Sequence, residues 1–313
     1  MCSSFFYMRH YGKNEYEKIV IQSFNLFINS PLQTPFKTYM DKLRVAILDM
    51  YNGEPNQGMR NIHQLLADYA TENQIIIEKK VYDVRGSHQI PDLSYHAYIS
   101  TGGPGSPIDT EGWEDAYLSW LHQIIVHNQI HAEKKHVFLI CHSFQVVCYH
   151  FQLAKVCLRR SESFGIFPMH KTNEAYHNYI TKNLTEPFYA VDSRKWQVIQ
   201  PNRHNLRVMG AKILLVEKAR HHVPYERATM AIQFTPEIFG TQFHPEADAD
   251  GMILYLNNAE KKKLVIDNYG LKKYNDMLNH LYDPDKIKLT QSLIIPKFLD
   301  EALAQIKNLM LVL

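Results

Sequence analysis

A cysteine at the end of a predicted strand is a candidate nucleophile. Cys141 follows the apolar stretch 137–140 and precedes residues 143–147, which can start a helix. A thiol at such a strand-to-helix turn faces outward, and the N-terminus of the helix favours its thiolate form. Because free cysteine is also among the most often buried residue types, Cys141 alone is better explained as a core thiol.

A histidine and a carboxylate after another predicted strand would supply the base that a thiol nucleophile needs. His244 and Glu246 are separated only by Pro245, which stiffens the link between them. Glu246 can then hold the imidazole in one tautomer while the other ring nitrogen faces the thiol. A His-Pro-Glu sequence in a loop is weak evidence for a catalytic site by itself. It supports one only together with a nucleophile such as Cys141.

The third segment is a glycine-rich turn at residues 100–107. Its adjacent glycines, Gly102 and Gly103, let the backbone approach a ligand and point an N–H at it, as an oxyanion hole requires. Alone, such a motif is more often a simple turn. Three such segments, each at the end of a predicted strand, together favour a cysteine-nucleophile site.

The elements that must position these residues alternate along the chain. Buried strands are predicted at 45–48, 75–77, 96–100 and 137–140, with helices at 59–69 and 113–126 between them. This alternation indicates a parallel sheet covered by helices. The strands predicted at 211–217, 230–234 and 239–243 follow one another without helices, so we expect antiparallel strands that complete a mixed α/β sheet.

Three regions are expected along the chain. Residues 1–42 show no clean periodicity and form an accessory N-terminal segment, or alternatively a short helix at 16–28 packed on the main domain; a biological start at Met40 is a further alternative. Residues 43–250 form the main domain. Residues 251–313 form a helical C-terminal extension, with helices predicted at 271–281 and 296–309.

Composition excludes several classes of function. The 313 residues are 45% hydrophobic and 21% charged with a net charge of +2, which implies neither a nucleic-acid nor a membrane partner. Four cysteines in so long a chain argue against a disulfide framework, and a reducing cytoplasm fits best. The 17 histidines lack metal-site spacing. We therefore predict no metal and no other cofactor.

Residues 43–250 resemble the class I glutamine amidotransferase domain, in particular stand-alone domains similar to the glutaminase part of GMP synthase. The likeness is carried by residues 49–53, by TGGPGSP at 101–107, by Cys141 with Gln145 four positions on, and by TQFHPEAD at 241–248. The resemblance implies an open, mostly parallel, flavodoxin-like sheet flanked by helices. It does not establish GMP synthesis.

The resemblance also implies roles for individual residues. Cys141 would attack the side-chain amide of glutamine to give a glutamyl thioester, with His244 relaying protons and Glu246 orienting it. The backbone N–H groups of Gly103 and His142 would form the oxyanion hole. The substrate would be held in a pocket lined by two further residues, Gln145 and Gly102.

The chain departs from the family pattern beside the nucleophile. Glycine usually stands two positions before and two after the cysteine, where this chain has Leu139 and Ser143. A leucine there either occupies room vacated elsewhere or distorts the turn, which bears on turnover. A histidine usually precedes the pocket glutamine, and here Phe144 stands in that place, which bears on the substrate.

Two other functions remain open. One is a binding or regulatory protein that keeps the fold without turnover. The other is a cysteine hydrolase, because Ile140-Cys141-His142 is similar to the intracellular peptidase branch of the same superfamily. For the amidotransferase, residues 251–313 hold no phosphate-binding glycine loop. The ammonia acceptor would then be a separate synthetase subunit, or the enzyme hydrolyses a γ-glutamyl small molecule without one.

Overall fold

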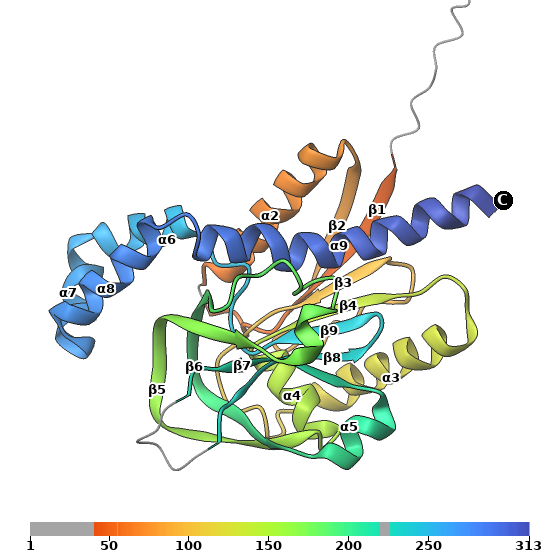
Figure 1. The fold of residues 1–313 in the computed structure, drawn as a ribbon. Helices are drawn as coiled ribbons and strands as arrows, with labels where there is room; N and C mark the ends of the chain where they lie inside the picture. Colours follow the sequence, from red (N-terminus) through yellow and green to blue (C-terminus); the bar gives the residue numbers. More distant parts are fainter. Residues whose placement is uncertain (1–40, 55, 220–225, 313) are drawn as a thin grey trace, which may run out of the picture. The chain divides into compact units, whose positions relative to one another are not determined.

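A nine-stranded sheet forms the centre of the described part of the protein (Figure 1). The computed structural model describes residues 41–54, 56–219 and 226–312, so residues 1–40 of the predicted accessory segment, with its alternative helix, lie outside the described residues. The strand order is β2-β1-β3-β4-β9-β8-β7-β5-β6. The strands are β1 (Lys42–Asp49), β2 (Ile76–Asp83), β3 (Ala97–Ser100), β4 (His136–Ile140), β5 (Ala154–Lys171), β6 (Phe188–Pro201), β7 (Lys212–Glu217), β8 (Thr229–Thr235) and β9 (Ile238–Thr241).

One half of the sheet is parallel and the other antiparallel. Strands β2, β1, β3, β4 and β9 pair in parallel, whereas β8, β7, β5 and β6 continue the sheet with antiparallel pairing. This confirms the predicted mostly parallel sheet completed by antiparallel strands. Strand β9 belongs to both halves, because it pairs antiparallel with β8 and parallel with β4. The carboxyl ends of β3, β4 and β9 therefore meet at one edge, which carries all three predicted site segments.

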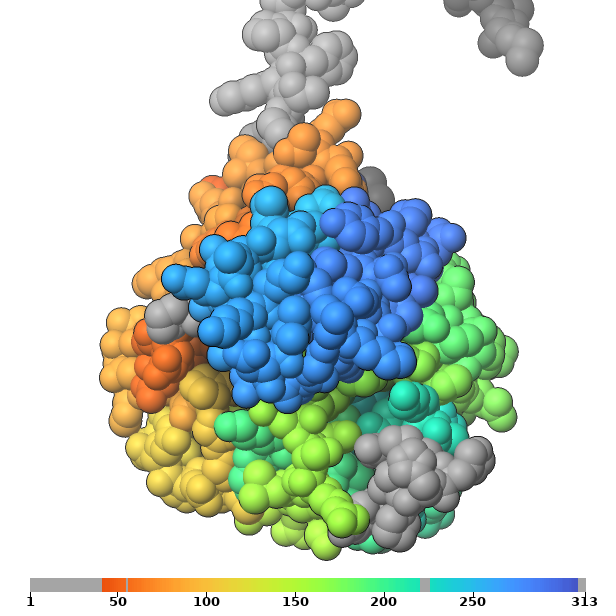
Figure 2. All heavy atoms as spheres, turned by 90° about the vertical axis from the view of Figure 1, so that its left-hand side faces the viewer, coloured from red at the N-terminus to blue at the C-terminus, as the bar shows by residue number. Residues whose placement is uncertain are grey.

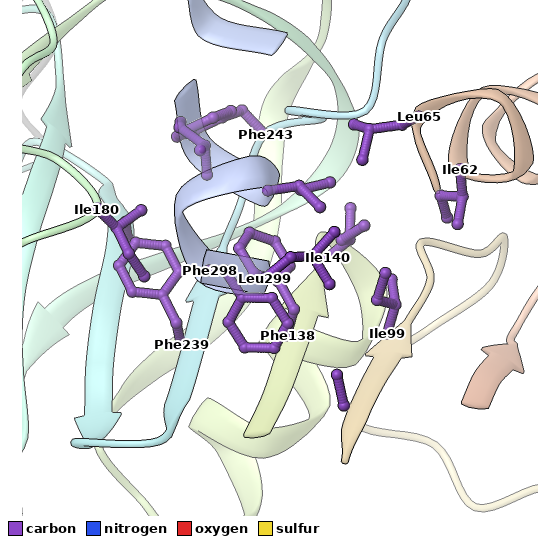
Figure 3. Packing of buried hydrophobic residues seen from close by; sticks show 14 of the residues in the cluster. Ile62, Leu65, Ile99, Phe138, Ile140, Ile180, Phe239, Phe243, Phe298 and Leu299 are labelled. Carbon is purple, nitrogen blue, oxygen red and sulfur yellow. The ribbon is translucent and has the colours of Figure 1, made fainter. Parts of the chain in front are cut away.

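Helices cover both faces of the sheet. The helices are α2 (Gly58–Asn73), α3 (Glu114–Ile130), α4 (His142–His150), α5 (Arg203–Met209), α6 (Ala249–Asn257), α7 (Ala259–Tyr269), α8 (Leu271–Tyr282) and α9 (Ile287–Val312), with a 3₁₀ turn η1 (Asn173–Tyr176). Helices α2 and α9 share one core cluster with the sheet, and α3, α4 and α5 share another. Figure 3 shows Phe298 of α9 beside Phe138 of β4, with ring centroids 5.2 Å apart.

The C-terminal region is helical, as predicted, but it is not one uniform appendage. Helices α6, α7 and α8 pack on β5 and β6 in a third apolar cluster, whereas α9 is part of the main core. The predicted start of α9 at Pro296 is wrong, because the helix begins at Ile287 and the proline lies inside it. The division at 42/43 and 250/251 stays a prediction. Among the described helices, none is long and apolar enough to cross a membrane.

Candidate active site

Cys141 forms a strained turn between β4 and α4. Its φ of +48° and ψ of −93° lie outside the regions that L-residues ordinarily adopt. Two backbone hydrogen bonds hold the turn: Cys141 N donates to Thr241 O at 2.8 Å, and Gln145 N donates to Cys141 O at 3.0 Å. The residue is only 6% exposed, but its thiol faces a cavity. The turn therefore has the geometry of a nucleophile elbow.

Leu139, two residues before the nucleophile, packs in the core opposite a glycine. Its side chain is fully buried on the face of the sheet that α3 and α4 cover. Directly opposite in the neighbouring strand is Gly240, and a Cβ built there would lie 3.1 Å from the Leu139 Cβ. The leucine thus occupies room that a glycine on β9 leaves open, which is the first of the two outcomes expected from the sequence.

Gly240→Ala is expected to lower the free energy of unfolding by about 1–3 kcal/mol, because its Cβ overpacks this contact. The new atom would also lie 2.8 Å from a Phe144 ring carbon and 3.0 Å from one of Phe234. Chemical denaturation measures the loss. In a Leu139→Gly background, which lacks the Cβ at position 139, the loss should shrink, since neighbouring sites couple. An equal loss in both backgrounds would show that Leu139 is not the residue that needs the glycine.

The other two departures from the family pattern also lie in the core. The hydroxyl of Ser143 accepts from Ile140 N at 2.9 Å and lies 2.9 Å from Ser100 O, so it ties the elbow to β3. Phe144 is fully buried against Phe234, with ring centroids 5.9 Å apart. Its side chain does not line the cavity described below, so it has no direct contact with a ligand there.

The glycine turn after β3 lies directly against the thiol and the imidazole. A Cβ at Gly102 would lie 3.0 Å from His244 Cε1 and 3.5 Å from Cys141 Cβ. A Cβ at Gly103 would lie only 2.2 Å from the Met50 carbonyl oxygen, so no larger residue fits there without backbone movement. The turn therefore lies between Met50, which directly follows β1, and the predicted catalytic pair. This close approach is what its two glycines permit.

His244 and Glu246 form a hydrogen-bonded pair on the loop after β9. Nδ1 of His244 lies 2.8 Å from Oε1 of Glu246, and the carboxylate is almost completely buried. The backbone N–H of His244 donates to Val191 O at 2.9 Å, which fastens the loop to β6. With Nδ1 held by the carboxylate, the Nε2 atom is left for a substrate or the thiol.

The local charges set the ionisation of His244. Burial alone would lower its pKa, but the Glu246 carboxylate and the Cys141 sulfur outweigh burial, and the pKa is raised well above its usual value. The thiol and the imidazole are close enough to share a side-chain hydrogen bond. Tyr51, nearby, has its pKa raised by burial and then by the charges of Glu246 and Cys141, so its hydroxyl stays protonated. The site therefore favours an imidazolium beside the sulfur.

A cavity of about 1040 Å³ opens at this edge of the sheet. Cys141, His244, Glu246, Gln145 and Gly103 all line it, so the structure brings these predicted residues together. Gly102 lies against Cys141 and His244 but is not one of the residues that line the cavity.

His142, like Gly102, does not line the cavity, and its ring is buried in the core, whereas the role predicted for it concerns its backbone N–H. The ring is buried near Trp113, with centroids 6.2 Å apart, and burial and then the Arg85 charge lower its pKa to about 3. Its backbone is placed differently. Within the described residues, nothing accepts a hydrogen bond from the N–H of His142 or of Gly103. The main chain of His142, and not its ring, is thus available at the elbow.

Strand β6 supplies a wall that the sequence did not predict. The Cys141 sulfur lies 3.9 Å from Ser193 O, and Gln145 Nε2 donates to Trp196 O at 3.4 Å. Arg194 fixes this strand from within, because its buried guanidinium bonds Asp192 at 2.8 Å and Trp196 O at 3.1 Å. The residues of 193–196 therefore pass beside the nucleophile as part of the cavity wall.

Solved structures of other proteins share this fold. A glutamine amidotransferase from Thermotoga maritima superposes with a TM-score of 0.55 at 13% identity, covering 83% of this chain and 98% of that one. A glutamine amidotransferase from Methylobacillus flagellatus gives 0.55 at 12% identity, covering 86% and 95%. At such low identity these likenesses show the fold alone. None of the curated protein sequences matches this chain.

The sequence itself matches a family profile. The profile described as "Glutamine amidotransferase class-I" aligns with residues 58–256, which is more than half of the chain and includes the strands and loops that carry Cys141 and His244. The chain therefore belongs to the class I glutamine amidotransferase family.

Proposed function

We propose that this protein cleaves the side-chain amide of glutamine, or of a γ-glutamyl compound, through a thioester on Cys141. The observation that carries the proposal is the strained Cys141 facing a cavity beside the hydrogen-bonded pair of His244 and Glu246. A backbone held in such a conformation costs stability, and that cost is typical of functional positions. Membership of the family gives the general activity, and the local geometry supports these residues as its agents.

The reaction divides into two steps. The Cys141 sulfur attacks the amide carbon, and the C–N bond breaks as His244 gives its proton to the leaving nitrogen. Water then attacks the thioester, returns a proton to His244 and releases glutamate. In both steps the negative oxygen would be stabilised by the N–H groups of Gly103 and His142. Gln145, which lines the cavity, would contact the glutamyl part, and Gly102, predicted to do the same, lies against Cys141 and His244.

The fate of the ammonia depends on partners. The helices after residue 250 serve the core and the cavity wall, and their sequence has no phosphate-binding glycine loop. We propose that the chain either delivers ammonia to a separate synthetase subunit or hydrolyses a γ-glutamyl small molecule without one.

Labelling with 6-diazo-5-oxo-L-norleucine, a glutamine-mimicking electrophile, tests the proposal. We expect one adduct per chain, mapped by peptide mass spectrometry to Cys141. Cys148→Ala is the matched control and should label like the wild type, because Cys148 is fully buried and burial raises its pKa well above the usual value.

Two outcomes would contradict the proposal. Folded protein that takes no label and releases no ammonia from glutamine or γ-glutamyl amides would favour a binding or regulatory role. Labelling by a peptidyl chloromethyl ketone but not by the glutamine mimic would favour a peptidase-like hydrolase.

A further inference from the structure

The active-site cavity is much larger than glutamine requires. Its volume of about 1040 Å³ matches the upper end of pockets that enclose drug-sized ligands, roughly 300–1,000 Å³. The part away from Cys141 is walled by α6 and α8, through Met252, Tyr255, Leu256 and Met277. Figure 2 faces the lobe of C-terminal helices, in blue, which lies between the orange α2 region and the green β5. A second group of a substrate would have room there.

The catalytic geometry tells which end of a substrate faces that wall. His244 must protonate the leaving nitrogen, so this nitrogen and any group attached to it lie on the His244 side of the scissile bond. The chain continues from His244 through Glu246 directly into α6. The N-cap residue of α6, Asp248, also lines the cavity. Gln145 and β6 lie beside the sulfur and suit the glutamyl part. The substituent on the amine therefore faces α6.

The wall on the α6 side is apolar. Leu256 and Met277 are buried in one cluster with Val191 and Ala247, which themselves line the cavity. Met252 packs against the same cluster, and Tyr255 adds a ring that is 41% exposed. Burying apolar groups of a ligand on such a surface is favourable, because both surfaces leave water.

The charged side chains around this wall lie at its rim, and Lys261 lies over an aromatic ring of the wall. Arg60 of α2 pairs with Asp248 at 3.0 Å across the cavity rim, and the Lys261 ammonium lies 5.5 Å from the centre of the Tyr255 ring. Glu162 and Lys195, the other charged residues at the rim, are exposed. A charged substituent would find no buried counter-charge on the apolar wall, whereas a neutral apolar one would fit it.

We propose that the preferred substrate is the γ-glutamyl amide of a bulky apolar amine and not free glutamine. This inference rests on the proposed thioester chemistry at Cys141. The sulfur bonds to the γ-carbonyl carbon, the C–N bond breaks, and the amine leaves with the proton from His244. Water hydrolyses the thioester, so the products are glutamate and the free amine, with water as the only co-reactant.

The experiment compares L-γ-glutamyl-benzylamide with glutamine. Benzylamine and ammonia have similar basicity, so a difference in kcat/KM reports contacts of the substituent and not the quality of the leaving group. Amine or ammonia release gives both rates. We expect the benzylamide to be preferred about tenfold or more, the size of effect that apolar pocket contacts supply.

Variants on α6 locate the preference. Tyr255→Ala, which removes wall area, and Met252→Trp, which fills the space, should each lower the benzylamide-to-glutamine ratio of kcat/KM about tenfold. Leu254→Ala is the matched control, because Leu254 is on the same helix, is 75% exposed and is not among the cavity-lining residues. It should leave the ratio unchanged.

The outcomes separate the two proposals. If glutamine is cleaved at least as well as the benzylamide, or if Tyr255→Ala lowers both rates equally, the substrate inference is overturned and the proposed function stands. If neither compound is cleaved and Cys141 takes no label from the glutamine mimic, the proposed function falls and the substrate inference falls with it.

Discussion

Cys141→Ala is expected to abolish amide cleavage, with a fall in kcat of about 10⁴–10⁶-fold, as when a covalent nucleophile is removed from a hydrolase. No other described cysteine can replace it. Cys148 is buried in the core, and Cys157 lies on β5, where its sulfur accepts a weak bond from Gln197 at 3.8 Å. A coupled glutamate assay measures the loss, and Cys148→Ala should retain wild-type turnover.

The same position also allows a test of strain that is independent of activity. Glycine adopts positive φ without steric cost, whereas alanine does not. Cys141→Gly should therefore be more stable to unfolding than Cys141→Ala by about 1 kcal/mol, while both are inactive. Cleavage that survives in either variant would exclude a thioester on Cys141. Equal stability of the two variants would mean that the elbow relaxes once the sulfur is gone.

The arrangement of the candidate site could be predicted from the sequence because its residues are concentrated in three short segments at strand ends. In a parallel sheet the carboxyl ends of neighbouring strands meet, so the segments containing Gly103, Cys141 and His244 needed only the correct strand order to come together. The alternation of apolar strands and helices gave the parallel half of the sheet for the same reason, since buried strands show as continuous apolar runs.

The other half of the sheet was harder to predict because its strands carry buried charges. Asp192 and Arg194 interrupt the apolar pattern of β6, yet they pair with each other inside the protein, and the Asp192 carboxylate also accepts from Ser163 at 2.6 Å. Such pairing across elements is invisible to a local pattern. As a result the β5–β6 pair was missed, and with it the wall beside Cys141.

The role of Leu139 could not be settled from the sequence for a related reason. Whether a leucine fits beside the elbow depends on the residue opposite it in β9, about one hundred positions away. Only the register between β4 and β9 places Gly240 there. The predicted start of α9 was wrong for a different reason. Proline favours the first turn of a helix, but residues 294–299 pack on the sheet, and the helix continues through Pro296.

Glu246→Gln is expected to lower kcat/KM by about 10²–10³-fold, the range typical of impaired proton transfer. Burial alone lowers the pKa of His244, and the Glu246 carboxylate is the strongest influence that raises it, ahead of Cys141. Glutamine keeps the hydrogen-bonding shape but removes the negative charge. The pKa of His244 should therefore fall toward or below its usual value in the variant.

This fall has a definite sign in the pH profile. The imidazolium that protonates the leaving nitrogen is present below the pKa of His244 and is lost as the pH rises through it. A lower pKa thus moves the alkaline limb of the kcat/KM profile to lower pH. Asp250→Asn is the matched control, because this carboxylate pairs with Lys288 at 3.0 Å and is largely exposed. If the alkaline limb stays in place in Glu246→Gln, another group sets the ionisation of His244. The Cys141 sulfur would be that group, because it is the next strongest influence that raises the pKa of His244.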